Sequence, residues 1–134
     1  MKKKADLLGG WIRKGQSDML AMAASLEAGA LDACCFHAQQ AAEKLLKAYL
    51  LHKDAEFPFT HNLVKLVQLA EQQDPKFASL RSAAERLTPY AVELRYDDEF
   101  WPSLDVAREA CRLAGEVRDL ILARLPHECA PPSQ

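Results

Sequence analysis

Apolar residues recur at every third or fourth position along most of the chain, which is the spacing of amphipathic helices. This pattern predicts a first helix over about residues 6–27, and Gly29 is suited to cap its C-terminus. A second helix is expected over about residues 31–53. A third helix should follow Thr60, a residue type that commonly caps helix N-termini.

Proline residues divide the second half of the chain. Asp74-Pro75 ends the third helix, because the residue before a proline disfavours helical dihedrals. A fourth segment over residues 80–94 contains Pro89 and should therefore kink or restart there. Ser103 is placed to cap a last helix that continues to Leu125. The pattern predicts an all-α fold, an antiparallel up-down helical bundle of four long helices plus one short helix.

The same periodicity predicts which side chains fill the core. We expect residues 1–125 to form a single helical domain and the Pro-rich residues 126–134 to be a disordered tail. The predicted core comprises Trp11, Ile12, Met19, Ala38, Leu45, Tyr49, Leu63, Leu66, Leu87, Cys111, Ala114 and Ile121.

Composition supports the all-α prediction and excludes several functions. The 134 residues suit one domain, and with five Val, two Ile and two Thr the strand-forming residues are scarce. A net charge of −2 gives no general attraction to nucleic acid, so any such contact would need a local basic patch. Neither a membrane-spanning run nor a signal-peptide core is present, so we expect a cytoplasmic protein with no membrane partner.

The cysteines give no sign of a metal site. Cys34, Cys35, Cys111 and Cys129 contain no CxxC spacing, and the first three lie on apolar helix seams, where reduced cysteine behaves as a small hydrophobic residue. The alternative is a pair of metal ligands from His37 and Cys34. We therefore expect no bound metal and no cofactor.

Three segments resemble the HEPN family of small helical domains. They are the run from Cys35 to Leu50, the tetrapeptide Thr60-His61-Asn62-Leu63 and the tripeptide Leu94-Arg95-Tyr96. Their order and spacing fit the family, and the resemblance spans about residues 4–125. It implies a helical bundle related to proteins of bacterial toxin–antitoxin systems and to proteins associated with minimal nucleotidyltransferases.

The resemblance also raises the question of ribonuclease activity. Catalytic family members carry an Arg followed, after four to six residues, by a His near the start of the last helix. Here the matching Arg is Arg95, and the corresponding His positions hold Phe100, Trp101 and Pro102, none of which exchanges a proton near neutral pH. None of the four histidines has an Arg five to seven positions before it. We therefore assign no catalytic residues and expect the chain not to be an enzyme.

Arg95, Tyr96 and His61 are the candidate residues for a ligand site. Arginine beside tyrosine suits phosphate binding combined with stacking on a base, and His61 should lie near the positive N-terminal end of a helix. The alternative is structural: Arg95 pairs with a neighbouring acidic residue, and His61 packs locally.

The second helix carries an unusual row of residues, Phe36, Gln40, Glu43 and Lys47, opposite its main apolar stripe. A phenylalanine heading a polar row favours a protein interface, and Phe100 and Trp101 add apolar surface in the later loop. The alternatives are an ordinary surface pair between Glu43 and Lys47, and aromatic side chains covered within the same subunit.

These features favour a non-catalytic HEPN interaction module that forms a homodimer. The resemblance implies a separately encoded minimal nucleotidyltransferase as partner, in a two-component nucleotidyltransferase or a toxin–antitoxin pair. Two alternatives stay open: a metal-independent ribonuclease toxin with a degenerate motif, and a module that binds a nucleotide.

Overall fold

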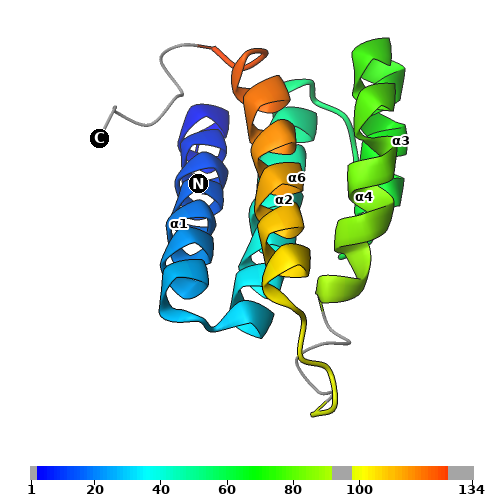
Figure 1. Ribbon diagram of the computed structural model, residues 1–134. Helices are drawn as coiled ribbons and strands as arrows, with labels where there is room; N and C mark the ends of the chain where they lie inside the picture. Colours follow the sequence, from blue (N-terminus) through cyan, green and yellow to red (C-terminus); the bar gives the residue numbers. More distant parts are fainter. Residues whose placement is uncertain (1–2, 92–97, 127–134) are drawn as a thin grey trace.

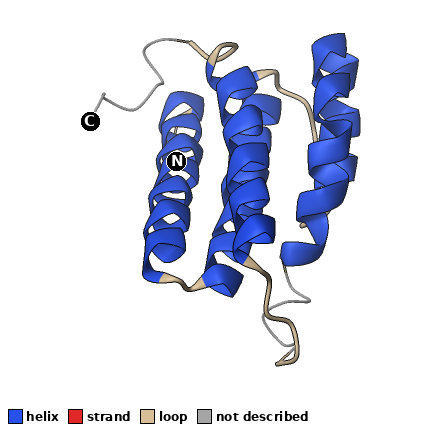
Figure 2. Cartoon of the chain, viewed as in Figure 1, coloured by secondary structure: helices blue, strands red, loops and turns tan. Residues whose placement is uncertain are grey.

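Helices account for all regular secondary structure in residues 3–91 and 98–126, the residues that the computed structural model describes (Figure 2). The all-α prediction is confirmed. No helix in these two ranges is long and apolar enough to cross a membrane. In chain order the elements are α1 (Lys4–Ala28), α2 (Leu31–His52), α3 (Leu63–Gln73), the 3₁₀ helix η1 (Pro75–Leu80), α4 (Arg81–Leu87), the 3₁₀ helix η2 (Thr88–Tyr90) and α6 (Leu104–Leu122).

The long helix α2 is the centre of the bundle. It packs against α1 on one side, against α6 along its length and against α3 on the other side (Figure 1). The shorter helices α3 and α4 lie beside each other on the side of the α2–α6 pair that is opposite α1. Since α2 has neighbours on several sides, most of its residues between Cys34 and Leu50 are buried.

The segment that the sequence predicts to kink or restart at Pro89 is short in its described part. It consists of the seven-residue helix α4 between two 3₁₀ helices. Asp74 caps η1 by accepting the N–H of Lys76 at 3.0 Å, and Pro75 occupies the first turn. Pro89 lies in η2, where a ring without an N–H ends regular α-helix. The prolines thus shorten this side of the bundle.

Two predicted helix ends are confirmed. Gly29 follows α1 with φ +81°, a left-handed conformation that glycine adopts without steric cost. Ser103 precedes α6, and its Oγ accepts the N–H of Val106 at 3.2 Å.

The predicted start of α3 is wrong by two residues. The side chain that caps α3 belongs to Asn62, whose Oδ1 accepts the N–H of Val64 at 2.9 Å. Thr60 Oγ1 instead accepts the N–H of Asn62 at 3.0 Å. Threonine and asparagine both favour such local hydrogen bonds. Because the backbone of Asn62 is extended, α3 begins only at the next residue.

The predicted core is largely confirmed. All of its members are buried except Trp11 and Cys111, which pack against the core from its edge. The rings of Tyr49 and Phe77 lie 4.4 Å apart between centroids, so α2 also packs on η1. At Gly15 a Cβ atom would lie 2.8 Å from Leu45 Cγ, which shows how closely α1 approaches α2. This close approach brings α1 next to the polar side chains of α2.

Candidate functional site

Two oppositely charged side chains of α2 are buried. Glu43 is 4% exposed and Lys47 is 5% exposed, and Lys47 Nζ donates to Glu43 Oε2 at 3.0 Å. The alternative of an ordinary surface pair is therefore wrong. A buried pair of this kind is maintained only when both charges are hydrogen-bonded, because an unmatched charge in the interior is costly.

Glu43 receives two further donors through its other oxygen. Gln39 Nε2 lies 3.1 Å from Glu43 Oε1, and His61 Nδ1 lies 2.8 Å from the same atom. Gln39 Nε2 also donates to the backbone carbonyl of His61 at 3.0 Å. These contacts join α2 to the segment that precedes α3. We name Gln39, Glu43, Lys47 and His61 the Glu43 cluster.

The contact with Glu43 orients the imidazole of His61. Since a carboxylate accepts hydrogen bonds, Nδ1 carries a proton and donates it, which leaves Nε2 of the neutral ring as an acceptor. The His61 side chain is 49% exposed, whereas that of Glu43 is 5% exposed. A buried carboxylate that fixes an exposed imidazole is an arrangement that can bind a donor or accept a proton.

Two aromatic rings enclose the ammonium group of Lys47. Its Nζ lies 5.8 Å from the ring centroid of Trp11 and 5.6 Å from that of Phe59, within the range of cation–π attraction. Phe59 is 97% exposed, and its ring meets that of His61 edge-on at 6.4 Å. Sequence reasoning did not assign Phe59 or Trp11 to this site. The sequence feature that could have identified Phe59 is the presence of a large apolar residue in a short loop between two helices.

A second carboxylate–imidazole pair joins α1 to α2. Asp18 is 8% exposed and accepts from His37 Nδ1 at 2.9 Å and from Lys44 Nζ. Cys34 Sγ lies against α6, 3.3 Å from Cys111 Sγ, so the two residues of the alternative ligand pair have different partners. Among the described residues no group of three or more His, Cys, Asp and Glu side chains could hold a metal ion.

The row predicted on α2 is divided between the surface and the interior. Phe36 and Gln40 are half-buried, and Gln40 Nε2 donates to Gln39 Oε1 at 2.7 Å, which links the row to the Glu43 cluster. The Phe36 ring lies edge-on to His37 at 5.4 Å. The accessible part of the row therefore consists of Phe36 and Gln40, and its role as an interface stays a prediction.

The loop before α6 presents apolar side chains. Trp101 is 73% exposed, and Leu104 and Val106 in the first turn of α6 are 43% and 37% exposed. Phe100 is partly buried, with its ring 6.3 Å from that of Tyr90. We name Trp101, Leu104 and Val106 the Trp101 patch. The candidate ligand residues Arg95 and Tyr96 lie outside the described residues.

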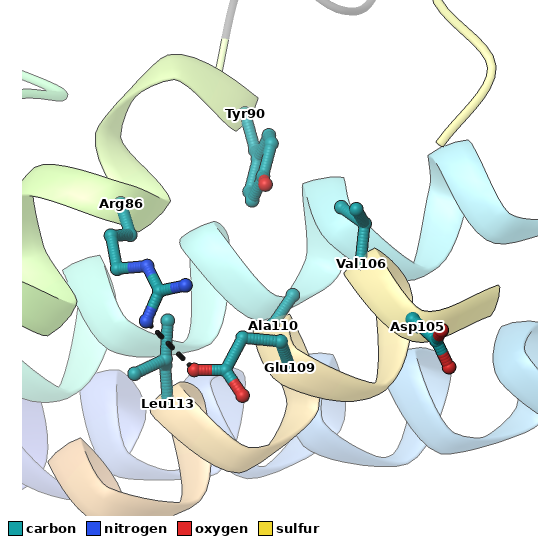
Figure 3. A pocket seen from close by; sticks show the side chains of 7 residues that line it. All are labelled: Arg86, Tyr90, Asp105, Val106, Glu109, Ala110 and Leu113. Carbon is teal, nitrogen blue, oxygen red and sulfur yellow. Dashed lines mark hydrogen bonds and ion pairs between the residues drawn. The ribbon is translucent and has the colours of Figure 1, made fainter. Parts of the chain in front are cut away.

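A pocket of about 290 Å³ lies between η2 and the first half of α6 (Figure 3). Two of its charged groups bind each other: Arg86 Nη1 donates to Glu109 Oε1 at 2.9 Å. Hydrogen bonding from Arg112 lowers the pKa of Glu109, and burial raises the pKa of Tyr90. The Arg86 guanidinium is therefore matched by Glu109 within the pocket. It is lined by Arg86, Tyr90, Asp105, Val106, Glu109, Ala110 and Leu113.

The fold and these clusters define a class of protein: a small helical domain whose central helix buries matched charges. A sequence profile of the HEPN domain matches residues 9–125, and the chain therefore belongs to the HEPN domain family. This confirms the resemblance seen in the sequence. No curated protein matches the chain.

Solved structures share the fold. The crystal structure of TT1696 from Thermus thermophilus is 26% identical and superposes with a TM-score of 0.74, covering 88% of this chain and 98% of that one. The crystal structure of ST0689, an archaeal HEPN homologue, is 21% identical with a TM-score of 0.70, covering 92% of this chain and 98% of that one.

Proposed function

We propose that this protein is a non-catalytic HEPN interaction module that dimerises and acts with a separately encoded minimal nucleotidyltransferase. The pair would form a two-component nucleotidyltransferase or a toxin–antitoxin system. The observation that carries the proposal is the Phe100-Trp101-Pro102 sequence, which stands where catalytic relatives offer a histidine. The place that would supply a proton donor presents a tryptophan that is 73% exposed.

The Trp101 patch supports self-association. Its three apolar side chains lie within a six-residue stretch of the loop and first turn of α6, and each is more than a third exposed. Burying a large apolar side chain stabilises a contact by roughly 1.5–3 kcal/mol, and a two-fold contact uses each residue twice. The half-buried Phe36 on α2 offers a further aromatic contact.

The sequence supports the proposal of a partner. It contains neither a glycine-rich phosphate loop nor a paired-carboxylate motif, which are the residues that nucleotidyl transfer would require. The carboxylates Glu43 and Asp18 are held by lysine and histidine side chains and so are not arranged to bind catalytic cations. The chemistry would therefore come from the partner.

Light scattering of the purified protein tests dimerisation. We expect a mass near twice 15.0 kDa for the unaltered chain and a shift toward 15.0 kDa for Trp101→Asp. Leu20→Asp is the matched control, because Leu20 is 60% exposed on α1 and outside the Trp101 patch. A mass of 15.0 kDa that does not change when the concentration rises tenfold would contradict the dimer. Co-purification with a minimal nucleotidyltransferase, lost in Trp101→Asp but not in Leu20→Asp, tests the partner.

Incubation with a labelled mixed RNA pool tests the absence of ribonuclease activity. We expect no cleavage, with or without divalent metal, because no histidine stands at the required spacing from Arg95. Cleavage abolished by Arg95→Ala or His61→Ala would refute this expectation. Cleavage that persists in both independently purified variants would indicate a contaminating nuclease.

One observation favours nucleotide binding as a second function. His61 Nε2 is free to accept a hydrogen bond, and the exposed Phe59 ring beside it can stack on a base. Calorimetric titration with ATP tests this function. Binding that weakens at least tenfold in both Phe59→Ala and His61→Ala, but not in Leu20→Asp, would support it, and equal heats in all four proteins would exclude it.

A further inference from the structure

Two cysteine thiols from different helices meet inside the bundle. Cys34 Sγ on α2 lies 3.3 Å from Cys111 Sγ on α6, although 77 positions separate them in sequence. Cys34 Sγ also lies 3.9 Å from the carbonyl oxygen of Ala107, one turn earlier on α6. Both cysteines are free thiols. The two sulfurs are thus in van der Waals contact, and a disulfide requires them to approach to about 2.05 Å.

The two thiols differ in accessibility. Cys34 is 0% exposed, whereas Cys111 is partly exposed at the edge of the core. A small oxidant can therefore reach Cys111 from solvent, and Cys34 lies behind it as the second thiol. Cys35 is also fully buried, but the sulfur contact with Cys111 belongs to Cys34.

We propose that Cys34 and Cys111 form a site of oxidative modification, at which a hydroperoxide converts the two thiols into a disulfide between α2 and α6. In the first step the Cys111 sulfur attacks hydrogen peroxide and breaks its O–O bond, which gives a sulfenic acid and one water molecule. In the second step the Cys34 sulfur attacks the sulfenic sulfur. The S–O bond breaks, and the leaving hydroxide takes the Cys34 proton as a second water molecule.

The buried environment determines the rate of the second step. Burial raises the pKa of Cys34 to about 12, and the neighbouring Cys111 thiol adds to this effect. Since the thiolate is the attacking form, little of it is present at neutral pH. Bridge formation should therefore be slow at pH 7 and faster at pH 9. Slow disulfide formation distinguishes this pair from the low-pKa thiols of rapid peroxide sensors.

The bridge would change the stability of the bundle. It would close a loop of more than 70 residues, and cross-links that close long loops restrict the unfolded chain most. We expect the melting temperature to rise by roughly 5–10 °C on oxidation and to return on reduction with dithiothreitol.

Mass spectrometry of the oxidised full-length chain tests the site. A Cys129→Ser background removes the cysteine that lies outside the described residues. After treatment with hydrogen peroxide and alkylation of remaining thiols, trypsin should yield residues 15–44 joined to residues 109–112, because no Lys or Arg interrupts either peptide. The joined peptides should weigh about 2 Da less than their sum, and dithiothreitol should separate them.

Single variants identify the thiol on α2. Residues 15–44 contain both Cys34 and Cys35, so Cys35→Ser is the matched control and should still form the bridge. Cys111→Ser, at a partly exposed position, and Cys34→Ser should both prevent it, and circular dichroism should show that each variant remains helical. A bridge that survives Cys34→Ser, a bridge between two molecules, or Cys111 sulfinic acid without any bridge would each overturn the proposal.

Discussion

At the scale of single residues, the carboxylate of Glu43 belongs to the most buried acidic side chain of the described residues. It is 4% exposed and accepts from lysine, glutamine and histidine side chains, which come from α2 and from the segment before α3. No buried side-chain nitrogen or oxygen atom of the described residues lacks a hydrogen-bond partner, and this includes the atoms of Glu43 and Lys47. The cluster therefore fixes the position of His61 without leaving an unmatched charge.

Replacement of Glu43 by Gln should destabilise the protein strongly. The variant leaves the Lys47 ammonium buried without its counter-charge, and breaking a buried pair in this way typically costs about 3–5 kcal/mol. Urea unfolding followed by circular dichroism measures the change. Glu116→Gln is the matched control: it also removes one member of an i,i+4 pair in a helix, but this pair is exposed. Equal losses in the two variants would show that burial is unimportant at Glu43.

A double variant separates the charge from the packing. Glu43→Gln combined with Lys47→Met removes both charges, so it should be more stable than Glu43→Gln alone. The methionine side chain can still pack between Trp11 and Phe59, since the lysine ammonium now lies close to both rings. A double variant less stable than the single one would assign the effect to lost contacts of Lys47.

At the scale of elements, the contact between α1 and α2 depends on a residue with no side chain. Gly15 lies in α1 and is buried against Leu45 of α2, so the two helices approach more closely than a larger residue allows. Gly10 lies five positions earlier in the same helix, and a Cβ placed there meets no atom within 4 Å. The two glycines form a natural pair for comparison.

Gly15→Ala and Gly10→Ala should shift stability in opposite directions. At Gly15 the new Cβ would lie 2.8 Å from Leu45 Cγ, so the overpacked contact should cost about 1–2 kcal/mol after the gain in helix propensity is subtracted. At Gly10 the space is open, and the alanine should stabilise the helix by about 0.5–1 kcal/mol. Thermal unfolding of both variants provides the measurement, and stabilisation by both would contradict the close approach.

Local sequence signals can predict where a helix ends, but they do not predict which side chains of that helix are buried. Gly29 and Ser103 were predicted correctly because their capping roles depend on a few neighbouring residues. The burial of Glu43 and Lys47 could not be predicted, because it depends on residues far away in the chain, such as Trp11 and Phe59. Likewise, the pairing of Asp18 with His37 requires the register of α1 against α2, which periodicity does not determine.

At the scale of the whole molecule, ion pairs connect the helices on the side of α3 and α4. Glu71 at the end of α3 binds Arg81 at the start of α4, with 2.6 Å between Oε1 and Nε. Asp74, after α3, binds Arg124 beyond α6, with 2.6 Å between Oδ2 and Nε. Hydrogen bonding from Arg81 lowers the pKa of Glu71, and hydrogen bonding from Arg124 lowers that of Asp74.

These shifts predict that the protein loses stability in acid. A carboxyl group whose pKa is lower in the folded state stabilises the fold above its unfolded pKa, and this contribution disappears as pH falls through the folded pKa. The unfolded values are 4.5 for Glu71 and 3.8 for Asp74, so urea midpoints should decline below about pH 4.5. Asp74→Asn and Arg124→Gln should each flatten the decline, and their combination should flatten it no further than Asp74→Asn alone. A larger effect in the combination would indicate other partners.

The two tryptophans give the molecule a pair of intrinsic fluorophores at different depths. Trp11 is partly covered and lies beside the Lys47 ammonium, whereas Trp101 is 73% exposed in the loop before α6. A neutral quencher such as acrylamide should therefore affect Trp101 more than Trp11. Emission from Trp11→Phe would report events at the Trp101 patch, and emission from Trp101→Phe would report the state of the Glu43 cluster. Tryptophan emission can thus be used to follow assembly and internal rearrangement separately, without an added label.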